Sequence, residues 1–420
     1  MFCINLAAGI MRIVYFHQYF STPSSSSGIR SYEMARRLVA GGHKVDLIST
    51  SAFLEGQFQF HKGWNVLEIE GVNVHVLKLP YSNKLSFLLR IRVFMEFALR
   101  SALYACRMKA DLIFATSTPL TIGFPAVIAA RKLRVPLVFE VRDLWPDVPI
   151  ALGVLKNPLL IWLAKRLELW TYRNSSRVIA LSPGMAEGVR RRLNIPVDVI
   201  PNAADIDLFQ QIDRSCYDMR QAHPELGDSK LLVYTGTIGL VNNIEYLVEL
   251  ASVFRELNTC LKVVVFGTGG EEGKIRSLAV SKDVWRKNFF IYPPVPKNFL
   301  PSILSEATLL FSTVLPVPAL WDNSANKFFD ALAAGRPIAI NHEGWQADII
   351  RNNFIGVVMG VGDPLAGAKA INEFVSDADG VSDAGRRAHE LALAEFSRDI
   401  LFAKFESVLA LTLVDADVIE

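Results

Sequence analysis

The sequence has 420 residues, which at roughly 150 residues per domain corresponds to about two to three domains and excludes a peptide hormone or a small binding module. Hydrophobic residues make up 51% and charged residues 20%, and the mean hydropathy is +0.27, a profile that excludes intrinsic disorder. The formal net charge is only +2, yet residues 1–209 hold 25 Lys and Arg against 15 Asp and Glu, and the remainder hold 19 against 27. The halves therefore carry +10 and −8, which predicts two lobes with different partners, the basic one facing an anionic substrate or lipid surface.

Cysteines and terminal segments indicate a reducing compartment. The cysteines lie tens of residues apart, without a CxxC pair or a histidine at metal-ligand spacing, and they are Cys3, Cys106, Cys216 and Cys260. This pattern predicts neither disulfides nor a zinc site. Residues 1–10 lack a basic n-region, and the apolar run at 158–164 is well short of the roughly 18 residues that span a bilayer. We expect a cytoplasmic protein that starts at Met1 or Met11.

Short apolar runs alternate with helical patterns along the first half. Runs this apolar are typical of strands buried on both faces of a parallel sheet, and they lie at 12–17, 45–50, 74–79, 112–116, 137–141, 178–181 and 197–200. A helix is predicted over Gly28–Ala40, with Gly41-Gly42 as its C-terminal stop. Strand, helix and strand then form a βαβ unit.

The second half repeats this alternation. Strands are predicted at 231–235, 262–266, 289–292, 307–312 and 337–340, with helices at 244–257, from 272 and at 325–334. The fold class is therefore α/β, with two doubly wound, Rossmann-like parallel-sheet domains. We expect an N-terminal domain at 1–200, a linker at 201–228, a C-terminal domain at 229–395, and a final helix at 396–420 that crosses back to the N-terminal domain.

Three loops follow predicted strands, where parallel sheets bind ligands. The first, His17 to Gly28, contains Ser24–Ser27 and lacks bulky side chains near the next helix, so its amides can approach a diphosphate; a plain connector is the alternative. The second, Gly267-Thr-Gly-Gly-Glu-Glu272, resembles a dinucleotide fingerprint, but Glu272 stands where GxGxxG requires glycine, which disfavours NAD binding.

The third loop, Asp322-Asn-Ser-Ala-Asn-Lys-Phe-Phe-Asp330, carries the strongest signal. Ser324 is expected to cap a helix, which places Lys327 and Asp330 on one face near the end that favours anions. The lysine can then bind a phosphate, and the aspartate can accept hydrogen bonds from a ribose diol. In the alternative, the two side chains form only a structural ion pair with each other on a solvated face.

Taken as a set, these motifs resemble the retaining GT-B glycosyltransferases of family 4 across nearly the whole chain. The motifs are the SSSSG loop, ALSPG at 180–184, PNAAD at 201–205, YTGTIG at 234–239, FGTGG at 266–270 and DNSANKFFDALAAGRP at 322–337. Members carry two acidic residues separated by seven positions, and Asp322 and Asp330 have that spacing. The sequence is most similar to the bacterial branch that builds surface polysaccharides, including the N-acetylfucosaminyl transferases.

The resemblance implies a GT-B architecture, in which the two domains face a cleft, and a role for each matched residue. The Gly28 loop would lie near the donor diphosphate, Asp322 near the transferred sugar, Asp330 on the ribose and Lys327 on the phosphates. The expected catalytic residues are Asp322, Lys327 and Arg142. The expected substrate-binding residues are His17, Ser27, Gly28, Asp143, Gly236, Thr237, Gly267, Gly269, Asn323, Ser324, Asn326 and Asp330.

Two positions depart from the family pattern. Most members have an arginine and a lysine after the YTG strand, whereas this chain has Thr237 and, a few residues on, Asn242 and Asn243. Many also have a histidine before the aspartate that ends the fifth strand, where this chain has Arg142. An arginine can grip a phosphate bidentately but cannot act as a base. We therefore expect Lys327 and Arg142 to neutralise the leaving diphosphate, without a metal or another cofactor.

The segment 85–109 is basic and rich in Phe and Leu. It carries five cations against a single acid, Glu96, which suits an anionic membrane interface; an ordinary helix that packs on the first sheet is an equal alternative. We expect peripheral contact with the inner face of the plasma membrane and no nucleic-acid partner. The expected activity is retaining transfer of a sugar from a UDP-sugar to a lipid-linked or polysaccharide acceptor. Alternatives are a UDP-sugar epimerase and a non-catalytic nucleotide-sugar-binding subunit.

Overall fold

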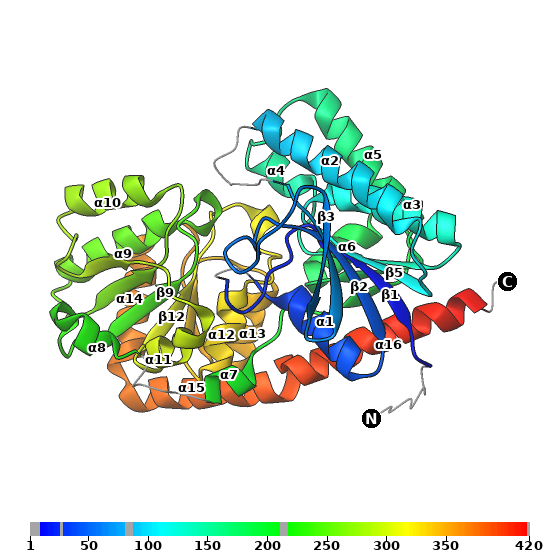
Figure 1. Cartoon of the computed structure of the whole chain (residues 1–420). Coiled ribbons are helices and arrows are strands. Elements are labelled where there is room, and N and C mark those ends of the chain that lie inside the picture. Colours follow the sequence, from blue (N-terminus) through cyan, green and yellow to red (C-terminus); the bar gives the residue numbers. More distant parts are fainter. Residues whose placement is uncertain (1–8, 26–27, 80–86, 211–216, 418–420) are drawn as a thin grey trace. The chain divides into compact units, whose positions relative to one another are not determined.

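A computed structural model describes residues 9–25, 28–79, 87–210 and 217–417 (Figure 1). The chain divides into two compact units, one formed by 1–201 with 401–420 and the other by 202–400. Each unit has its own sheet and its own core, and each is α/β with a mostly parallel sheet, which confirms the predicted fold class.

The first unit is built on an eight-stranded sheet in the order β3-β4-β2-β1-β5-β6-β7-β8, parallel except for β3 against β4. Its strands are β1 (Arg12–Phe16), β2 (Lys44–Thr50), β3 (Trp64–Ile69), β4 (Val72–Leu77), β5 (Leu112–Thr116), β6 (Leu137–Val141), β7 (Arg177–Ala180) and β8 (Val197–Val199). Its helices are α1 (Arg30–Ala40), α2 (Phe87–Ala105), α3 (Gly123–Leu133), α4 (Asp147–Ala151), α5 (Pro158–Arg173), α6 (Pro183–Arg190) and most of α16 (Arg398–Asp417).

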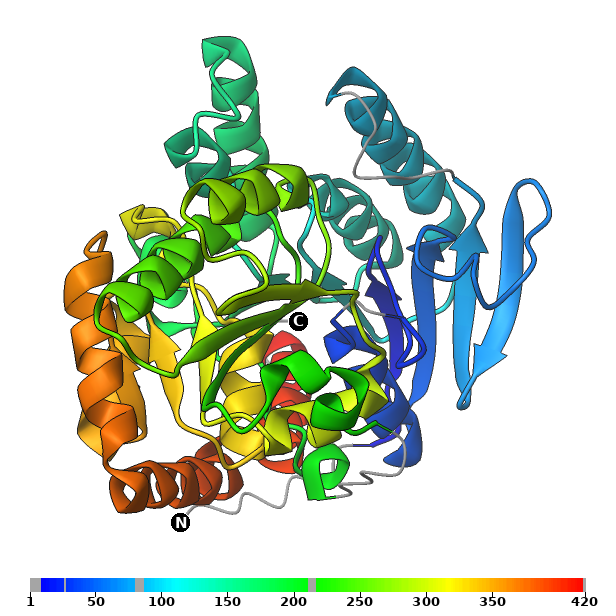
Figure 2. The ribbon, with the colours of Figure 1, turned by 90° about the vertical axis from the view of Figure 1, so that its left-hand side faces the viewer.

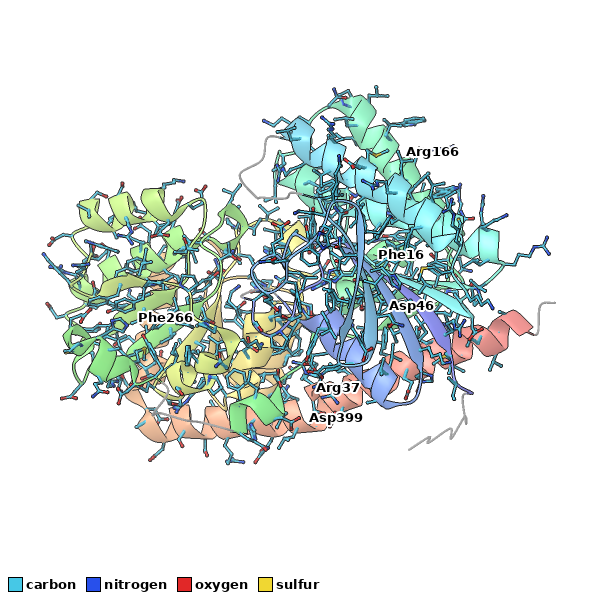
Figure 3. All side chains as sticks on the ribbon, viewed as in Figure 1. Phe16, Arg37, Asp46, Arg166, Phe266 and Asp399 are labelled. Atoms are coloured by element: carbon cyan, nitrogen blue, oxygen red, sulfur yellow. The ribbon has the colours of Figure 1, made fainter. Side chains whose placement is uncertain are left out.

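Alternation along β1 assigns the two faces of this sheet. Phe16 (labelled in Figure 3) packs in a buried cluster with Phe97 of α2 and Ala126 of α3. On the opposite face, the Phe114 ring of β5 meets the Phe405 ring of α16 at a centroid distance of 5.0 Å. Figure 1 shows α2, α3 and α5 on one side of the sheet and α1 and α16 on the other.

The second unit has a six-stranded parallel sheet in the order β11-β10-β9-β12-β13-β14, which Figure 2 shows from one side. Its strands are β9 (Leu231–Thr235), β10 (Lys262–Phe266), β11 (Phe289–Tyr292), β12 (Leu309–Ser312), β13 (Ile338–Ile340) and β14 (Gly356–Val358). Its helices are α7 (Ile206–Gln210), α8 (Met219–Ala222), α9 (Ile244–Glu256), α10 (Glu272–Ser281), α11 (Leu300–Ser305), α12 (Asn326–Ala333), α13 (Trp345–Asn353), α14 (Pro364–Ser376) and α15 (Ala378–Leu391).

Burial explains why the strands were readable from sequence, and where the pattern was incomplete. Phe266 (Figure 3) and its neighbours on β10 are buried on both faces, as a central parallel strand requires. The antiparallel edge strand β3 and the three-residue β14 lack such a run and were not predicted. The described part of the expected linker forms α7 and α8, and its Phe209, Met219 and Leu226 side chains lie in the core of the second unit.

Among the described residues, no helix is long and apolar enough to cross a membrane. In the same part of the chain, no group of three or more His, Cys, Asp or Glu side chains is clustered as a metal site would require. The described cysteines, Cys106 and Cys260, are free thiols.

Candidate functional site

In the first unit, the candidate residues follow β1, β5 and β6 at their carboxyl ends. Gly28 lies just before α1, and its carbonyl oxygen accepts a hydrogen bond from Ser21 Oγ at 2.9 Å. This bond joins the start of the loop after β1 to a residue two positions before α1. Ser27, the other predicted loop residue, lies outside the described residues.

A buried ion pair ties the start of α1 to the end of β6. Arg30 donates from Nε and Nη2 to Glu140 Oε1 at 3.0 and 2.8 Å, and from Nη1 to the Pro201 carbonyl at 2.6 Å. Thr116 Oγ1 donates to the other Glu140 oxygen at 2.7 Å. Burial alone would raise the pKa of Glu140, but the charge and hydrogen bonds of Arg30, with smaller contributions from Arg142 and Thr116, hold it below its ordinary value. Glu140 is therefore an ionised, fully engaged carboxylate and not a base.

His17, Arg142 and Asp143 come together beside this pair. His17 is 4% exposed, and its Nε2 lies 3.5 Å from Arg142 Nη1. Burial, assisted by the Arg142 charge, lowers the pKa of His17 well below its usual value, so the ring is neutral. Because a guanidinium can only donate, Nε2 is the acceptor and Nδ1 carries the proton. Nδ1 is buried and has no hydrogen-bond partner among the described residues, which leaves one donor for a ligand.

The loop after β5 holds the two residues that follow β6. The Arg142 backbone N–H donates to Ser117 Oγ at 3.0 Å, and Thr118 Oγ1 donates to Asp143 Oδ2 at 3.3 Å. Burial raises the pKa of Asp143, against the opposing effects of Arg142 and Thr118. The first unit thus offers a neutral imidazole, a guanidinium and a desolvated carboxyl group within one cluster.

In the second unit, two glycine loops after β9 and β10 touch backbone to backbone. A Cβ atom on Gly267 would lie 1.9 Å from the Gly236 carbonyl oxygen, and one on Gly269 would lie 2.2 Å from the Ile238 carbonyl oxygen. The Gly236 N–H donates to the Phe266 carbonyl at 3.0 Å. These glycines are required by close packing of the two loops, whatever they bind. Thr237 is exposed.

Lys327 lies beside the first of these loops. It is in the first turn of α12, with its Nζ 5.0 Å from the centroid of the Tyr234 ring and in van der Waals range of a Cβ placed on Gly236. Of the residues that the structure describes, none forms an ion pair or a hydrogen bond with the ammonium. Desolvation lowers the pKa of Lys327 to about 8, and the charge of Asp330 opposes this only in part. A cation without a counterion at the carboxyl end of a parallel sheet is suited to an anionic ligand.

Asp330 is 6% exposed and pairs with a different lysine than expected. Lys297 Nζ lies 2.9 Å from Asp330 Oδ1. The alternative in which Lys327 and Asp330 only neutralise each other on a solvated face is therefore wrong. The ion-pair partner of Asp330 is Lys297, which the sequence pattern did not indicate.

The loop before α12 differs from its prediction at one residue. Ser324 does not cap the helix, whose N-cap is Ala325, because Ser324 Oγ accepts a hydrogen bond from the Asn202 N–H at 3.0 Å. Asn323 Nδ2 donates to the Leu320 carbonyl at 2.6 Å, whereas its Oδ1 is buried without a partner in the described chain. Asn326 is exposed and Asp322 is partly exposed.

A further polar cluster follows β13 and was not predicted. His342 and Gln346 are both fully buried, yet His342 Nε2 and both amide atoms of Gln346 have no hydrogen-bond partner among the described residues. Trp321 Nε1 is buried and unpartnered in the same way, and a Cβ on Gly344 would lie 2.9 Å from the Trp321 carbonyl oxygen. Unmet buried polar groups commonly mark a ligand or ordered water. The polar residues directly after β13 were the available sequence signal.

Comparison with known proteins agrees with this two-unit geometry. Residues 27–203 match the family described as Glycosyl transferase 4-like domain, and residues 217–391 match Glycosyl transferases group 1. The putative colanic acid biosynthesis glycosyl transferase WcaI of Escherichia coli K12 is 24% identical over 309 residues, which cover 70% of this chain and 74% of WcaI.

Solved structures show the same fold over nearly the whole chain. Sucrose-phosphate synthase from Thermosynechococcus elongatus superposes with a TM-score of 0.76 at 15% identity, covering 96% of this chain and all of that one. Anabaena HepE in complex with UDP and glucose gives a TM-score of 0.71 at 14% identity, covering 95% of this chain and 99% of that one. The chain is therefore a glycosyltransferase of the GT-B fold, with a glycosyl transferase 4-like domain followed by a glycosyl transferases group 1 domain.

Proposed function

We propose that the protein transfers a sugar, N-acetylfucosamine or another N-acetylated sugar, from a UDP-sugar to a lipid-linked or polysaccharide acceptor with retention at the anomeric carbon. The observation that carries this proposal is Lys327, a desolvated cation beside the loop after β9 that has no counterion among the residues described by the structure. A nucleoside diphosphate would supply the missing negative charge. The resemblance to WcaI, whose name refers to colanic acid biosynthesis, and to HepE, which was solved with UDP and glucose, supports a UDP-sugar donor and a polysaccharide product.

Chemistry in the second unit would centre on the departing diphosphate. As the bond from the anomeric carbon to the diphosphate oxygen lengthens, negative charge grows on that oxygen, and the Lys327 ammonium stabilises it. Asp330, which pairs with Lys297, is proposed to accept a hydrogen bond from a ribose hydroxyl, and Asp322 is proposed to contact the transferred sugar. The remaining polar groups of the transferred sugar could bond to the buried polar atoms of His342, Gln346 and Trp321 that have no partner among the described residues. In this proposal, side chains neutralise the diphosphate charge that a metal ion neutralises in other enzymes, so we propose no metal and no cofactor.

In the first unit, we propose that the His17 cluster binds the acceptor. The Nδ1–H of His17 can donate to a hydroxyl or phosphate oxygen. Arg142, which we also propose to help neutralise the leaving diphosphate, can bind a phosphate bidentately. Asp143, whose pKa is raised by burial, is a candidate to accept the proton of the attacking hydroxyl.

Membrane contact through 85–109 is part of the proposal. Within its described part, the segment exposes Leu89, Met95, Leu99 and Leu103 of α2, together with Arg92 and Arg100 of α2 and Arg107 just after it. Such a mixed surface suits the interface of an anionic bilayer, and we propose peripheral attachment to the inner face of the plasma membrane. Binding to anionic vesicles that survives glutamine substitution of all five basic residues of the segment would contradict this.

The transfer reaction is tested by UDP release from UDP-N-acetylfucosamine with and without an undecaprenyl-diphosphate-linked acceptor. We expect release that depends on the acceptor, and we expect Asp322→Ala and Lys327→Ala each to lower turnover by about a hundredfold or more while the fold persists. Near-normal turnover in either variant would show that the site is misplaced. Conversion of the donor to an isomeric sugar without any acceptor would instead show an epimerase.

A further inference from the structure

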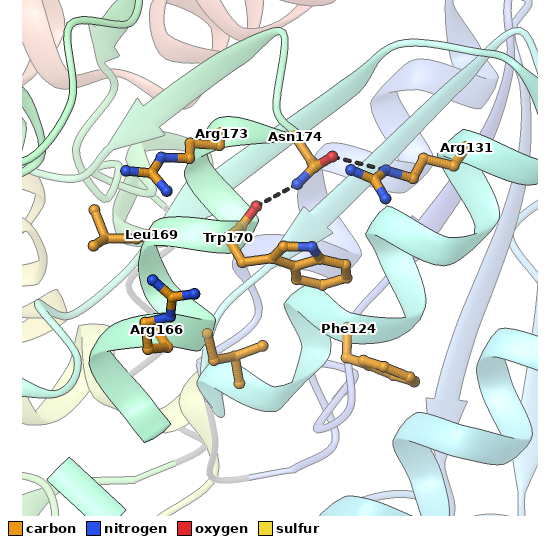
Figure 4. Close-up of a pocket in the computed structure, with 8 residues that line it drawn as sticks. Phe124, Arg131, Arg166, Leu169, Trp170, Arg173 and Asn174 are labelled. Carbon is orange, nitrogen blue, oxygen red and sulfur yellow. Dashed lines mark hydrogen bonds between the residues drawn. The ribbon is translucent and has the colours of Figure 1, made fainter. Parts of the chain in front are cut away.

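The first unit contains a groove that shares no residue with the site described above. It has a volume of about 540 Å³ and lies between α3 and α5 (Figure 4). Phe124 and Arg131 come from α3, whereas Arg166, Trp170 and Arg173 come from α5. Three guanidinium groups thus surround two aromatic rings.

None of these arginines has a counterion among the described residues. Arg131 donates from Nε to Asn174 Oδ1 at 2.8 Å, and Asn174 in turn donates from Nδ2 to the Trp170 carbonyl at 2.6 Å. The amide therefore orients the Arg131 fork, which also lies 5.9 Å from the Trp170 ring, and leaves both terminal nitrogens available. Arg166 and Arg173 are exposed and have no carboxylate within ion-pair distance in the described chain. The arrangement can receive an anion with several oxygens.

The floor and the margin of the groove are apolar. The rings of Phe124 and Trp170 lie 6.1 Å apart, and α5 continues toward its N-terminus with Leu159, Trp162 and Leu163, which are 62%, 56% and 47% exposed. Positions 159, 162, 163, 166, 170 and 173 follow helical spacing, so these side chains and the arginines share one face of α5. A small inorganic anion would contact only the arginines, whereas an anionic amphiphile would contact both the arginines and the apolar margin.

We propose that this groove binds the phosphate headgroup of an anionic phospholipid, while Leu159, Trp162 and Leu163 enter the acyl boundary of the bilayer. Tryptophan and arginine at one surface suit this depth, because the indole prefers the headgroup region and the guanidinium binds phosphate. The inference deepens the proposed membrane contact of α2 but rests on different residues. A soluble phosphate compound and an acidic protein segment are the competing occupants.

The test is co-sedimentation of the full chain with phosphatidylcholine vesicles, with and without phosphatidylglycerol. We compare the wild type with R131Q/R166Q/R173Q and with K44Q/K62Q/R191Q, a control that removes the same charge from exposed residues of the first unit elsewhere. The proposal predicts binding only to anionic vesicles. It also predicts a loss of about a hundredfold in the partition coefficient for the groove variant, because each of the three basic groups contributes a factor of roughly five, and little change for the control.

Two further arms identify the occupant. Trp162→Ser leaves the charge unchanged and should weaken vesicle binding markedly if the apolar margin enters the bilayer. Inorganic phosphate at the same phosphate concentration should fail to displace the vesicles. Equal loss in the groove and control variants, normal binding by Trp162→Ser, or displacement by free phosphate would each overturn the proposal. Stabilisation by UDP is measured on every variant, because its absence would refute the proposed function while leaving the vesicle result interpretable.

Discussion

Replacement of Lys327 by methionine separates the effect of the lysine charge on the free energy of unfolding from its effect on UDP affinity. Methionine keeps the unbranched apolar stem and removes the charge. The pKa of about 8, compared with the ordinary 10.5, corresponds at 1.36 kcal/mol per unit to a penalty of about 3 kcal/mol on the charged form, and the cation–π contact with Tyr234 offsets part of it. We therefore expect Lys327→Met to unfold at equal or higher denaturant concentration than the wild type at pH 7. The same variant should bind UDP about ten- to a hundredfold more weakly, the loss expected when a charged hydrogen-bond donor of about 1.5–3 kcal/mol is removed.

The pH dependence follows from the direction of this shift. Because the pKa of Lys327 is lower in the folded than in the unfolded state, the penalty is fully present below pH 8 and is relieved as the pH rises toward 10.5. The wild type should therefore gain stability relative to Lys327→Met across that range. UDP affinity of the wild type should fall over the same range, as the ammonium that binds the diphosphate loses its proton.

Chemical denaturation and titration calorimetry measure both quantities. Lys369→Met, which removes an exposed lysine from α14 in the same unit, serves as the matched control and should change neither. A Lys327→Met variant that binds UDP with wild-type affinity, or that is strongly destabilised, would contradict the role assigned to Lys327. The first result would mean that the diphosphate lies elsewhere, and the second that the lysine is structural.

Three other substitutions test the structure around both sites. Gly267→Ala should destabilise the second unit by about 2 kcal/mol or more, because its Cβ would collide with the Gly236 carbonyl oxygen; an unchanged denaturation midpoint would contradict this close approach. Arg30→Met should cost about 3–5 kcal/mol in denaturation by leaving Glu140 buried without its cation, while affinity for UDP persists. Gln346→Leu should leave stability unchanged or raised and alter KM among UDP-sugars without altering UDP affinity; unchanged selectivity would show that the amide binds only water.

The sequence was sufficient to predict the architecture because central parallel strands are buried on both faces and are therefore apolar along their length. β5, β6 and β10 are apolar on both faces, and their limits were predicted to the residue. The edge strand β3 pairs only with β4 and is half exposed, so it has no comparable signature. Loops before helices are harder still, since the Ser324 hydroxyl could cap α12 or bind Asn202 with equal chemical sense.

Partners distant in sequence could not have been assigned in advance. Arg30 meets Glu140 across 110 positions, and Lys297 meets Asp330 across 33. Only the folded chain reveals that Lys327 forms no ion pair with a carboxylate in the part of the chain that the structure describes. The same holds for the groove between α3 and α5. Each helix has both polar and apolar residues, and only together do their side chains form a cationic, aromatic surface.

The most direct measurement is thermal unfolding of the purified protein with UDP, GDP, ADP, CMP and NAD in turn. At about a hundredfold over the dissociation constant, one-site binding adds about 2.7 kcal/mol to the free energy of unfolding. We expect stabilisation by UDP, and loss of that stabilisation in Lys327→Met but not in Lys369→Met. No shift with UDP, or a shift with NAD in its place, would contradict the assignment of the loop before α12 to the diphosphate of a UDP-sugar.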